Sequence, residues 1–234
     1  MALVTCPECG RKVSERADAC PNCGYPICAS LQKSKQEEAQ KDFDRGAQYY
    51  HTGDYQNAFK YVSIAAEKGL LTAQRNLGVL YENGTGVLQD YHKAIEWYQR
   101  ASEQGDTLAQ LFLAFIYADG KGGIPQDYQK AVELYQKSAN RGNAQAQWEI
   151  GSLYYEGEYF QQDYRKAIEW YQKSASLGYR AAQYKLGYMY EKGEGTRPDC
   201  FEAIEWYKKA ANQGHEDAAI RLERIMKNID YSVL

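Results

Sequence analysis

A phrase of about 36 residues recurs through most of the chain, and this repeat constrains the fold more than any other sequence feature. Each copy opens with an alanine, followed four residues later by Leu or Ile. The opening alanines are Ala73, Ala109, Ala146, Ala182 and Ala218. A period of this length predicts a solenoid, in which each repeat is one supersecondary unit that buries its apolar face against its neighbours.

Both halves of the repeat have the spacing of a helix. In the second half of one copy, Ala94, Trp97, Tyr98 and Ala101 recur at i, i+3, i+4 and i+7 and so form one apolar stripe. An aspartate precedes each second half, where it suits a helix N-cap, and a glycine follows, where it suits the left-handed residue after a helix. These residues are Asp90, Asp127, Asp163 and Asp199, and Gly105, Gly142, Gly178 and Gly214. The repeat therefore predicts a helical hairpin.

The expected fold class is all-α: an α/α superhelical solenoid of helical-hairpin repeats, preceded by a small zinc-ribbon knuckle. Residues 1–30 form the ribbon and 31–41 a linker or leading helix. Residues 42–217 form five hairpins, the first with tetratricopeptide spacing and the next four longer. Residues 218–234 carry a C-terminal capping helix and a tail, because a first helix there has no second half.

Four cysteines near the amino end are paired as two C-x2-C units: Cys6 with Cys9, and Cys20 with Cys23. Two such turns can close a tetrahedral shell of thiolates around one zinc ion. The alternative is a pair of disulfides, which a reducing compartment disfavours. So short a segment cannot bury enough surface to fold alone, so the zinc is expected to be structural. Cys28 and Cys200 are expected to be unligated thiols.

Composition and charge exclude several classes of protein. The formal net charge is -3, which argues against a protein built to neutralise nucleic-acid phosphates. No apolar run approaches the roughly 18–20 residues of a membrane helix, and no basic-then-apolar leader is visible. We therefore expect a cytoplasmic protein without a membrane span.

The chain shows no constellation of acid, base and nucleophile, so an enzyme is not expected. His51, His92 and His215 lie in different repeats. The recurring glutamates each precede a base by four residues, a spacing typical of surface helix pairs. They are Glu96, Glu133, Glu169 and Glu205.

The stretch AQYKLGYMYEKGEGTRPDCFEAIEWYKKAANQG resembles a Sel-one-like repeat (SLR), and the resemblance covers roughly residues 73–222. The knuckle resembles a bacterial zinc-ribbon module. The SLR resemblance implies right-handed α/α arrays that hold other proteins together. Some bacterial members carry a disulfide in every repeat, but this chain has only Cys200 there, so that subgroup does not fit.

In tetratricopeptide-like stacks the first helices line the concave face, so their variable positions are candidates for a partner-binding groove. Counting the opening alanine as place 1, places 3, 7 and 10 share one helical face. In the middle repeats that face is apolar and aromatic, as protein-binding sites are. The candidate residues are Arg75, Val79, Leu111, Phe115, Trp148, Tyr155, Tyr184 and Tyr188. The alternative for these side chains is packing between adjacent hairpins.

Two functions remain open on the sequence. The first is a non-enzymatic scaffold or adaptor that binds a peptide or protein in the groove, with the zinc ribbon as a second docking point. The second is a regulatory protein whose ribbon contacts nucleic acid or a nucleic-acid enzyme. Nucleic-acid binding is disfavoured because the ribbon's bases Arg11, Lys12 and Arg16 are balanced by its acids.

Overall fold

The computed structural model describes residues 2–228, which fold into two short strands and eleven α-helices. The strands are β1 (Leu3–Thr5) and β2 (Lys12–Ser14). In the first part of the chain the helices are α1 (Ile27–His51), α2 (Tyr55–Glu67), α3 (Leu71–Asn83) and α4 (Tyr91–Glu103). They are followed by α5 (Thr107–Asp119), α6 (Tyr128–Asn140), α7 (Ala144–Glu156), α8 (Tyr164–Ser176), α9 (Arg180–Lys192), α10 (Cys200–Asn212) and α11 (Glu216–Asn228).

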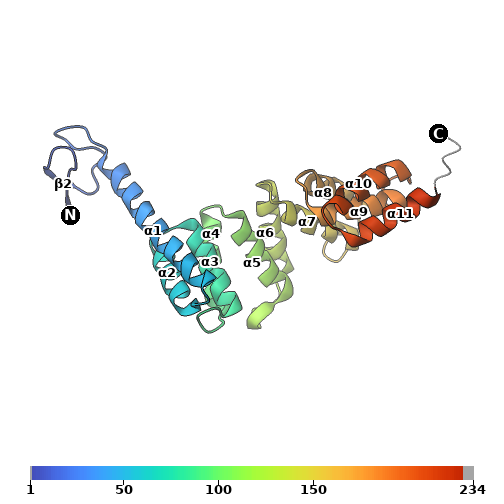
Figure 1. Ribbon diagram of the computed structural model, residues 1–234, viewed down its shortest axis with the longest axis horizontal. Helices are drawn as coiled ribbons and strands as arrows, with labels where there is room; N and C mark the ends of the chain where they lie inside the picture. Colours follow the sequence, from blue (N-terminus) through green and yellow to red (C-terminus); the bar gives the residue numbers. More distant parts are fainter. Residues whose placement is uncertain (1, 229–234) are drawn as a thin grey trace. The chain divides into compact units, whose positions relative to one another are not determined.

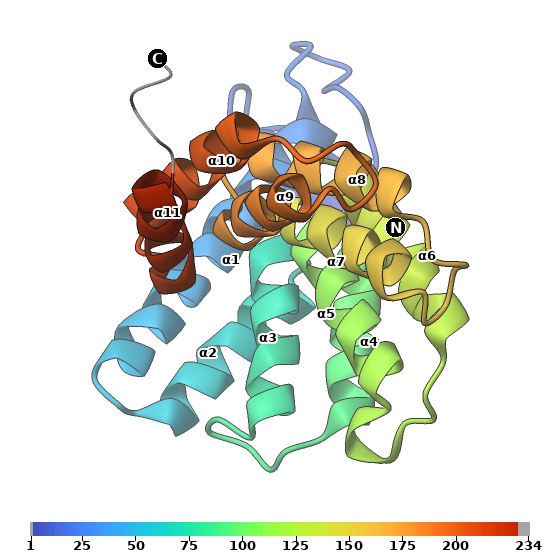
Figure 2. The same ribbon diagram turned by 90° about the vertical axis from the view of Figure 1, so that its right-hand side faces the viewer.

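The helices pair in chain order as antiparallel hairpins, α1 with α2 through α9 with α10, as the repeat predicts. The chain divides into two compact units, residues 1–104 and 105–234. The first holds the strands and α1 to α4, and the second holds α5 to α11 (Figure 1). In the second unit α11 packs against α10 and α9, and Figure 2 shows these three helices as neighbours. The sequence predicted α11 as a capping helix; residues 229–234 of the expected tail lie outside the described part.

The amino-terminal strands pair antiparallel, with Val4 opposite Val13. The small core beneath them contains Ile27, the first residue of α1, and Leu31 packs against that core. From there α1 continues without a break to His51 and packs against α2. The leading helix expected over residues 31–41 is therefore the middle of one long helix, which begins in the core of the ribbon and ends in the first hairpin.

The predicted caps are confirmed at every second helix. The aspartates before α4, α6, α8 and α10 accept a hydrogen bond from a backbone N–H in the first turn, as N-caps do. Gly105, Gly142, Gly178 and Gly214 follow the ends of these helices with φ between 78° and 91°. Residues other than glycine rarely adopt this left-handed backbone conformation, which explains why a glycine closes each unit.

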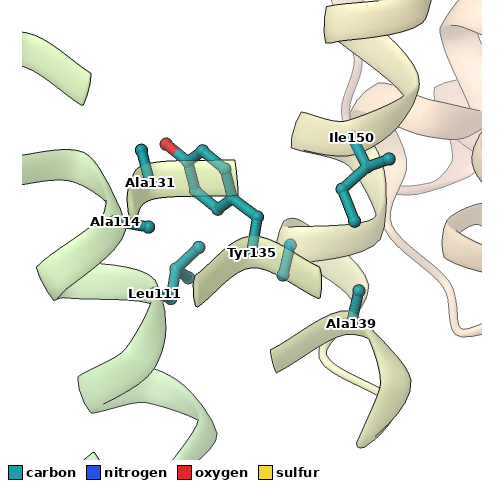
Figure 3. Close-up of a cluster of buried hydrophobic side chains, with 7 residues drawn as sticks. Leu111, Ala114, Ala131, Tyr135, Ala139 and Ile150 are labelled. Carbon is teal, nitrogen blue, oxygen red and sulfur yellow. The ribbon is translucent and has the colours of Figure 1, made fainter. Parts of the chain in front are cut away.

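The four hairpins from α3 to α10 are each closed by a tyrosine of the second helix packed against a small residue of the first, whereas in the α1–α2 hairpin Gly46 faces Val62. The rings of Tyr98, Tyr171 and Tyr207 are fully buried. A Cβ atom on the facing glycine, such as Gly187, would lie 2.7 Å from the Tyr207 ring, so only glycine allows this approach. The hairpin of α5 and α6 uses Ala114 in the same place, and Figure 3 shows it beside the ring of Tyr135.

A buried glutamine occupies place 2 of α3, α5, α7 and α9, and in two of these helices it ties neighbouring helices together. Gln74 accepts a hydrogen bond from Gln104 (2.6 Å), and Gln183 accepts one from Gln213 (2.7 Å). Gln147 occupies the same place in α7, but the position that would supply its donor is Leu177. The Oε1 atom of Gln147 is buried and has no hydrogen-bond partner among the described residues.

We expect Leu177→Gln to stabilise the protein. Leu177 is exposed, so its removal loses little burial, and a glutamine there can donate to Gln147 as its counterparts do. Satisfying a buried acceptor should raise the free energy of unfolding by about 0.5–1.5 kcal/mol, measured by urea denaturation. Leu177→Met is the matched control and should change stability little; an equal gain in both variants would contradict the explanation.

Candidate functional site

The four cysteines of the two C-x2-C units converge on one point. Their sulfur atoms all lie within 4.8 Å of one another, and the Cys6–Cys23 and Cys9–Cys20 sulfur pairs are 3.6 Å apart. A tetrahedral zinc ion with Zn–S bonds of 2.3 Å requires sulfurs about 3.8 Å apart, whereas a disulfide requires about 2.05 Å. The geometry therefore fits one metal ion and does not fit disulfides.

Backbone turns position these thiols and stabilise their ionised form. Gly10 and Gly24 have φ of 71° and 75°, and their N–H groups donate to the carbonyls of Cys6 and Cys20. The backbone N–H of Arg11 lowers the pKa of Cys9 to about 6. For Cys23 the backbone N–H of Tyr25 acts in the same direction, but burial and the neighbouring thiols raise its pKa to about 12. Such crowded thiols ionise together only beside a cation, which zinc would supply.

The surface that the first helices of the hairpins present is here called the first-helix face. On α7, α9 and α11 this face carries a network of tyrosines and cations. Lys185 on α9 lies over the ring of Tyr155 on α7, with its Nζ atom 3.6 Å from the centroid. Arg221 on α11 lies over the ring of Tyr188, 4.8 Å from its centroid, and forms a 3.0 Å ion pair with Glu191. Tyr155 and Tyr188 are thus half-buried and engaged by the chain's own cations.

Not all eight predicted groove residues lie on an accessible surface. Leu111 is fully buried in the core of the α5–α6 hairpin, so the prediction that it contacts a partner was wrong. Place 3 points into the space between hairpins rather than into a groove. For the same reason Trp148 packs on Tyr179, and Tyr184 stacks on His215. Arg75, Val79 and Phe115 are half-buried.

Two pockets lie on the first-helix face, one in each unit. The pocket of the first unit, about 320 Å³, is apolar and lies between α1, α2 and α3, with Val79 in its wall. The pocket of the second unit, also about 320 Å³, lies between α5, α6 and α7. Its apolar wall includes Phe115, and its rim carries carboxylates. The lining residues used below are Phe115, Tyr128, Tyr135, Glu149, Glu156 and Glu158.

Glu149 is the unusual residue of the second pocket. Burial, together with the negative charges of Glu156 and Asp119, raises the pKa of this carboxyl to about 7. Asp119 itself forms an exposed ion pair with Lys121 at 3.1 Å. Glu149 was not among the predicted groove residues, because these came from places 3, 7 and 10 of the first helix and Glu149 is at place 4.

We expect Glu149 to make the protein less stable as the pH rises. Its pKa is higher in the folded chain than the roughly 4.3 of an unfolded glutamate, so the folded state holds the proton more tightly. The loss of stability that ionisation of Glu149 causes is absent below about pH 4. It grows as the pH rises from about 4.5 to 7 and reaches about 3 kcal/mol above pH 7.

The measurement is urea denaturation of wild type and Glu149→Gln at pH 5 and pH 8. The variant should gain stability over wild type only at pH 8, because glutamine has no proton to lose. Glu169→Gln, at an exposed position of α8, is the matched control. An equal response of the two variants to pH would show that the local environment of Glu149 is not the cause.

Comparison with known families assigns both parts of the chain. A Sel1 repeat model matches residues 43–70, 71–106, 107–143, 144–179 and 180–215. The chain belongs to the Sel1 repeat family. The match includes the first hairpin, which the sequence analysis assigned to the tetratricopeptide type. A zinc-ribbon domain model matches residues 2–27. Sel1 repeat proteins mediate protein–protein interactions.

Known relatives agree with this assignment. A crystal structure of a Sel1 repeat protein from Oxalobacter formigenes is 33% identical, with a TM-score of 0.70, and the match covers 82% of this chain and 77% of that one. "DAP3-binding cell death enhancer 1" of Mus musculus is 34% identical over 90 residues, and "ERAD-associated E3 ubiquitin-protein ligase component HRD3A" of Arabidopsis thaliana is 30% identical over 80. The matches cover 38% and 34% of this chain, but only 17% and 12% of those proteins.

The Sel1 hairpins also give the recurring bases a partner that the charge pattern did not predict. Arg100, Lys173 and Lys209 lie over the indole rings of Trp97, Trp170 and Trp206, 3.9–4.4 Å from the centroids. The stem of a lysine or arginine covers an aromatic face well, so these bases shield the half-buried tryptophans three residues before them. None of the helices in residues 2–228 combines the length and the apolar run that a membrane span requires.

Proposed function

We propose that this Sel1 repeat protein is a non-enzymatic scaffold or adaptor that binds a peptide or protein partner on its first-helix face. The observation that supports this proposal best is the pocket between α5, α6 and α7, where aromatic side chains and carboxylates line a surface formed by packed hairpins. Half-buried aromatic side chains in such a pocket are the usual anchors of a protein interface. The name of the mouse relative, DAP3-binding cell death enhancer 1, agrees with this class of function.

The zinc ribbon would serve as a second docking point. We propose that Cys6, Cys9, Cys20 and Cys23 hold one structural zinc ion, which leaves no open coordination position for chemistry. Because Ile27 belongs to the ribbon core, α1 would connect the two binding elements directly. A reducing compartment such as the cytoplasm would keep these thiols available for metal.

Site-specific photo-crosslinking tests the proposed face. A benzophenone amino acid in place of Phe115 or Val79 should cross-link a protein partner in cells. The same group in place of Gln136, an exposed residue on second helix α6, is the matched control and should cross-link much less. Cross-linking of the same partner from Gln136 alone would contradict the proposal.

A further inference from the structure

In the second unit, the contact between two successive first helices is here called a joint. The α7–α9 and α9–α11 joints both have a cation at place 4 of the later helix. In α9 this place holds Lys185, and in α11 it holds Arg221. Each cation lies over an aromatic ring of the first helix before it: Lys185 over Tyr155 at place 10, and Arg221 over Tyr188 at place 7. Arg221 also pairs with Glu191 of that helix, and Lys185 is attracted by Glu156 and Glu194. In both joints the later helix therefore supplies the positive charge that its neighbours require.

The joint between α5 and α7 has the opposite charge at this place. Place 4 of α7 is Glu149, and across the joint it meets the negative charge of Asp119. The aromatic ring remains, because Phe115 stands where Tyr188 stands in α9. Of the described residues that line the pocket here, none is Lys or Arg. This joint thus has an aromatic ring at the place used in the α9–α11 joint, together with carboxylates, but it lacks the cation of its counterparts.

The loop beside this pocket differs from its counterparts in the other hairpins. In the loops before α4 and α10, Gly86 and Gly195 press against the start of the preceding second helix. A Cβ on Gly86 would lie 2.0 Å from the carbonyl oxygen of Tyr55, and one on Gly195 would lie 2.7 Å from the carbonyl carbon of Tyr164. Both glycines have positive φ, 74° in each case.

The loop before α8 carries Tyr159 at the equivalent position, and the residue equivalent to Tyr55 and Tyr164 is Tyr128 at the start of α6. Among the described residues only glycines have positive φ, so Tyr159 does not adopt the conformation that the close approach needs. Tyr128 and Tyr159 are both exposed, and the pocket opens between Tyr128 and the loop residue Glu158. The joint that lacks a cation thus contains a pocket that an incoming side chain can enter.

We propose that this pocket binds an arginine or lysine side chain from a basic segment of the partner protein, in the position that Lys185 and Arg221 occupy in the other two joints. This inference rests on the proposed function and names the chemistry of the partner. The stem of the incoming side chain would lie on Phe115, and its charged end would meet Glu149 and Glu156. Glu158 at the rim would add attraction for further basic residues of the segment.

The test is an NMR titration of the full, zinc-loaded chain with the peptide acetyl-Gly-Gly-Arg-Gly-Gly-amide. Its twin with citrulline has the same shape without the charge. At millimolar concentrations the arginine peptide should shift amide signals of residues 115–119, 128–135 and 149–158. The citrulline peptide should bind about tenfold more weakly or not at all, because one desolvated charge pair is lost. Equal binding of the two peptides, or shifts elsewhere on the surface, would overturn the proposal.

Variants at place 4 sharpen the result. Glu149→Gln should weaken the arginine peptide about fivefold or more, since it removes the central carboxylate. Glu149→Lys should abolish binding while the fold is kept, because it gives this joint the arrangement that Lys185 forms in the next. Glu169→Lys makes the same change of charge outside the pocket and should bind like wild type. Unchanged binding by Glu149→Lys would overturn the proposal.

A titration with calcium chloride at matched ionic strength separates a side-chain pocket from a metal site. Stronger binding of Ca²⁺ than of the arginine peptide at the same amides would also overturn the inference. These outcomes are distinct from failure of the proposed function. If Phe115 still cross-links a protein partner while the arginine peptide does not bind, the partner-binding face stands and only its basic ligand is wrong.

Discussion

Cys20→Ser should release the metal and unfold the ribbon while the hairpins stay folded. Cys20 is buried in the ribbon core beside Val13 and Ile27, so its loss removes both a ligand and the centre of that core. Structural zinc contributes about 10–16 kcal/mol to the folding of small metal domains, far more than so short a segment can gain by burial. The helices α2 to α11 have their own apolar clusters and do not depend on the metal.

Metal analysis and circular dichroism measure this result. Wild type should contain close to one zinc per chain, and the variant none. A chelator should leave the helical signal almost unchanged, apart from the first turns of α1, where Ile27 and Leu31 pack on the ribbon. Cys28→Ser is the matched control, because this thiol lies outside the ligand set and should keep its metal. A folded, metal-free ribbon with two disulfides would contradict this account.

Tyr207→Ala should cost about 3–5 kcal/mol of stability, as expected for a large aromatic side chain removed from a core. The ring is fully buried against Gly187, and its hydroxyl donates a 2.7 Å hydrogen bond to Glu191. The neighbouring Trp206→Ala should cost less, about 1–2 kcal/mol, because the indole is half-buried and one face is covered only by Lys209.

Urea denaturation of both variants at fixed zinc concentration gives the comparison, with Tyr207→Phe as the control that removes only the hydroxyl. That control should cost about 1.5–3 kcal/mol, because the hydrogen bond it loses is made to a charged carboxylate. A larger loss for Trp206→Ala than for Tyr207→Ala would show that the tryptophan, not the tyrosine, closes the hairpin.

The repeat period made the hairpins and their caps predictable from the sequence, and the paired C-x2-C spacing did the same for the thiol cluster. Periodicity locates helices because apolar spacing has a direct physical meaning, and the cap residues have few other uses. It did not decide which of two adjacent aromatics enters the core. Trp206 and Tyr207 both lie on the apolar stripe, and only the approach of Gly187 to the Tyr207 ring settles which is fully buried.

The groove was predictable only in part, because the proposed binding site depends on residues that depart from the repeat pattern. Leu111 was placed on the surface by its place number, whereas the structure buries it between helices. Glu149 and Tyr159 look unremarkable in a single repeat. They become informative only when the same positions are known to hold a cation and a glycine in packed neighbouring joints.

Photo-crosslinking identifies the partner protein. Hydrogen exchange of the non-covalent complex with that partner tests most directly the central claim, that the partner binds the first-helix face. If the partner binds the first-helix face, backbone amides of α5 and α7 should exchange more slowly in the complex than in the free protein. Amides of α8 and α10, which contribute no residue to the pocket, should change much less. Protection confined to residues 2–26, or to the second helices, would contradict the assignment of this face as the binding surface.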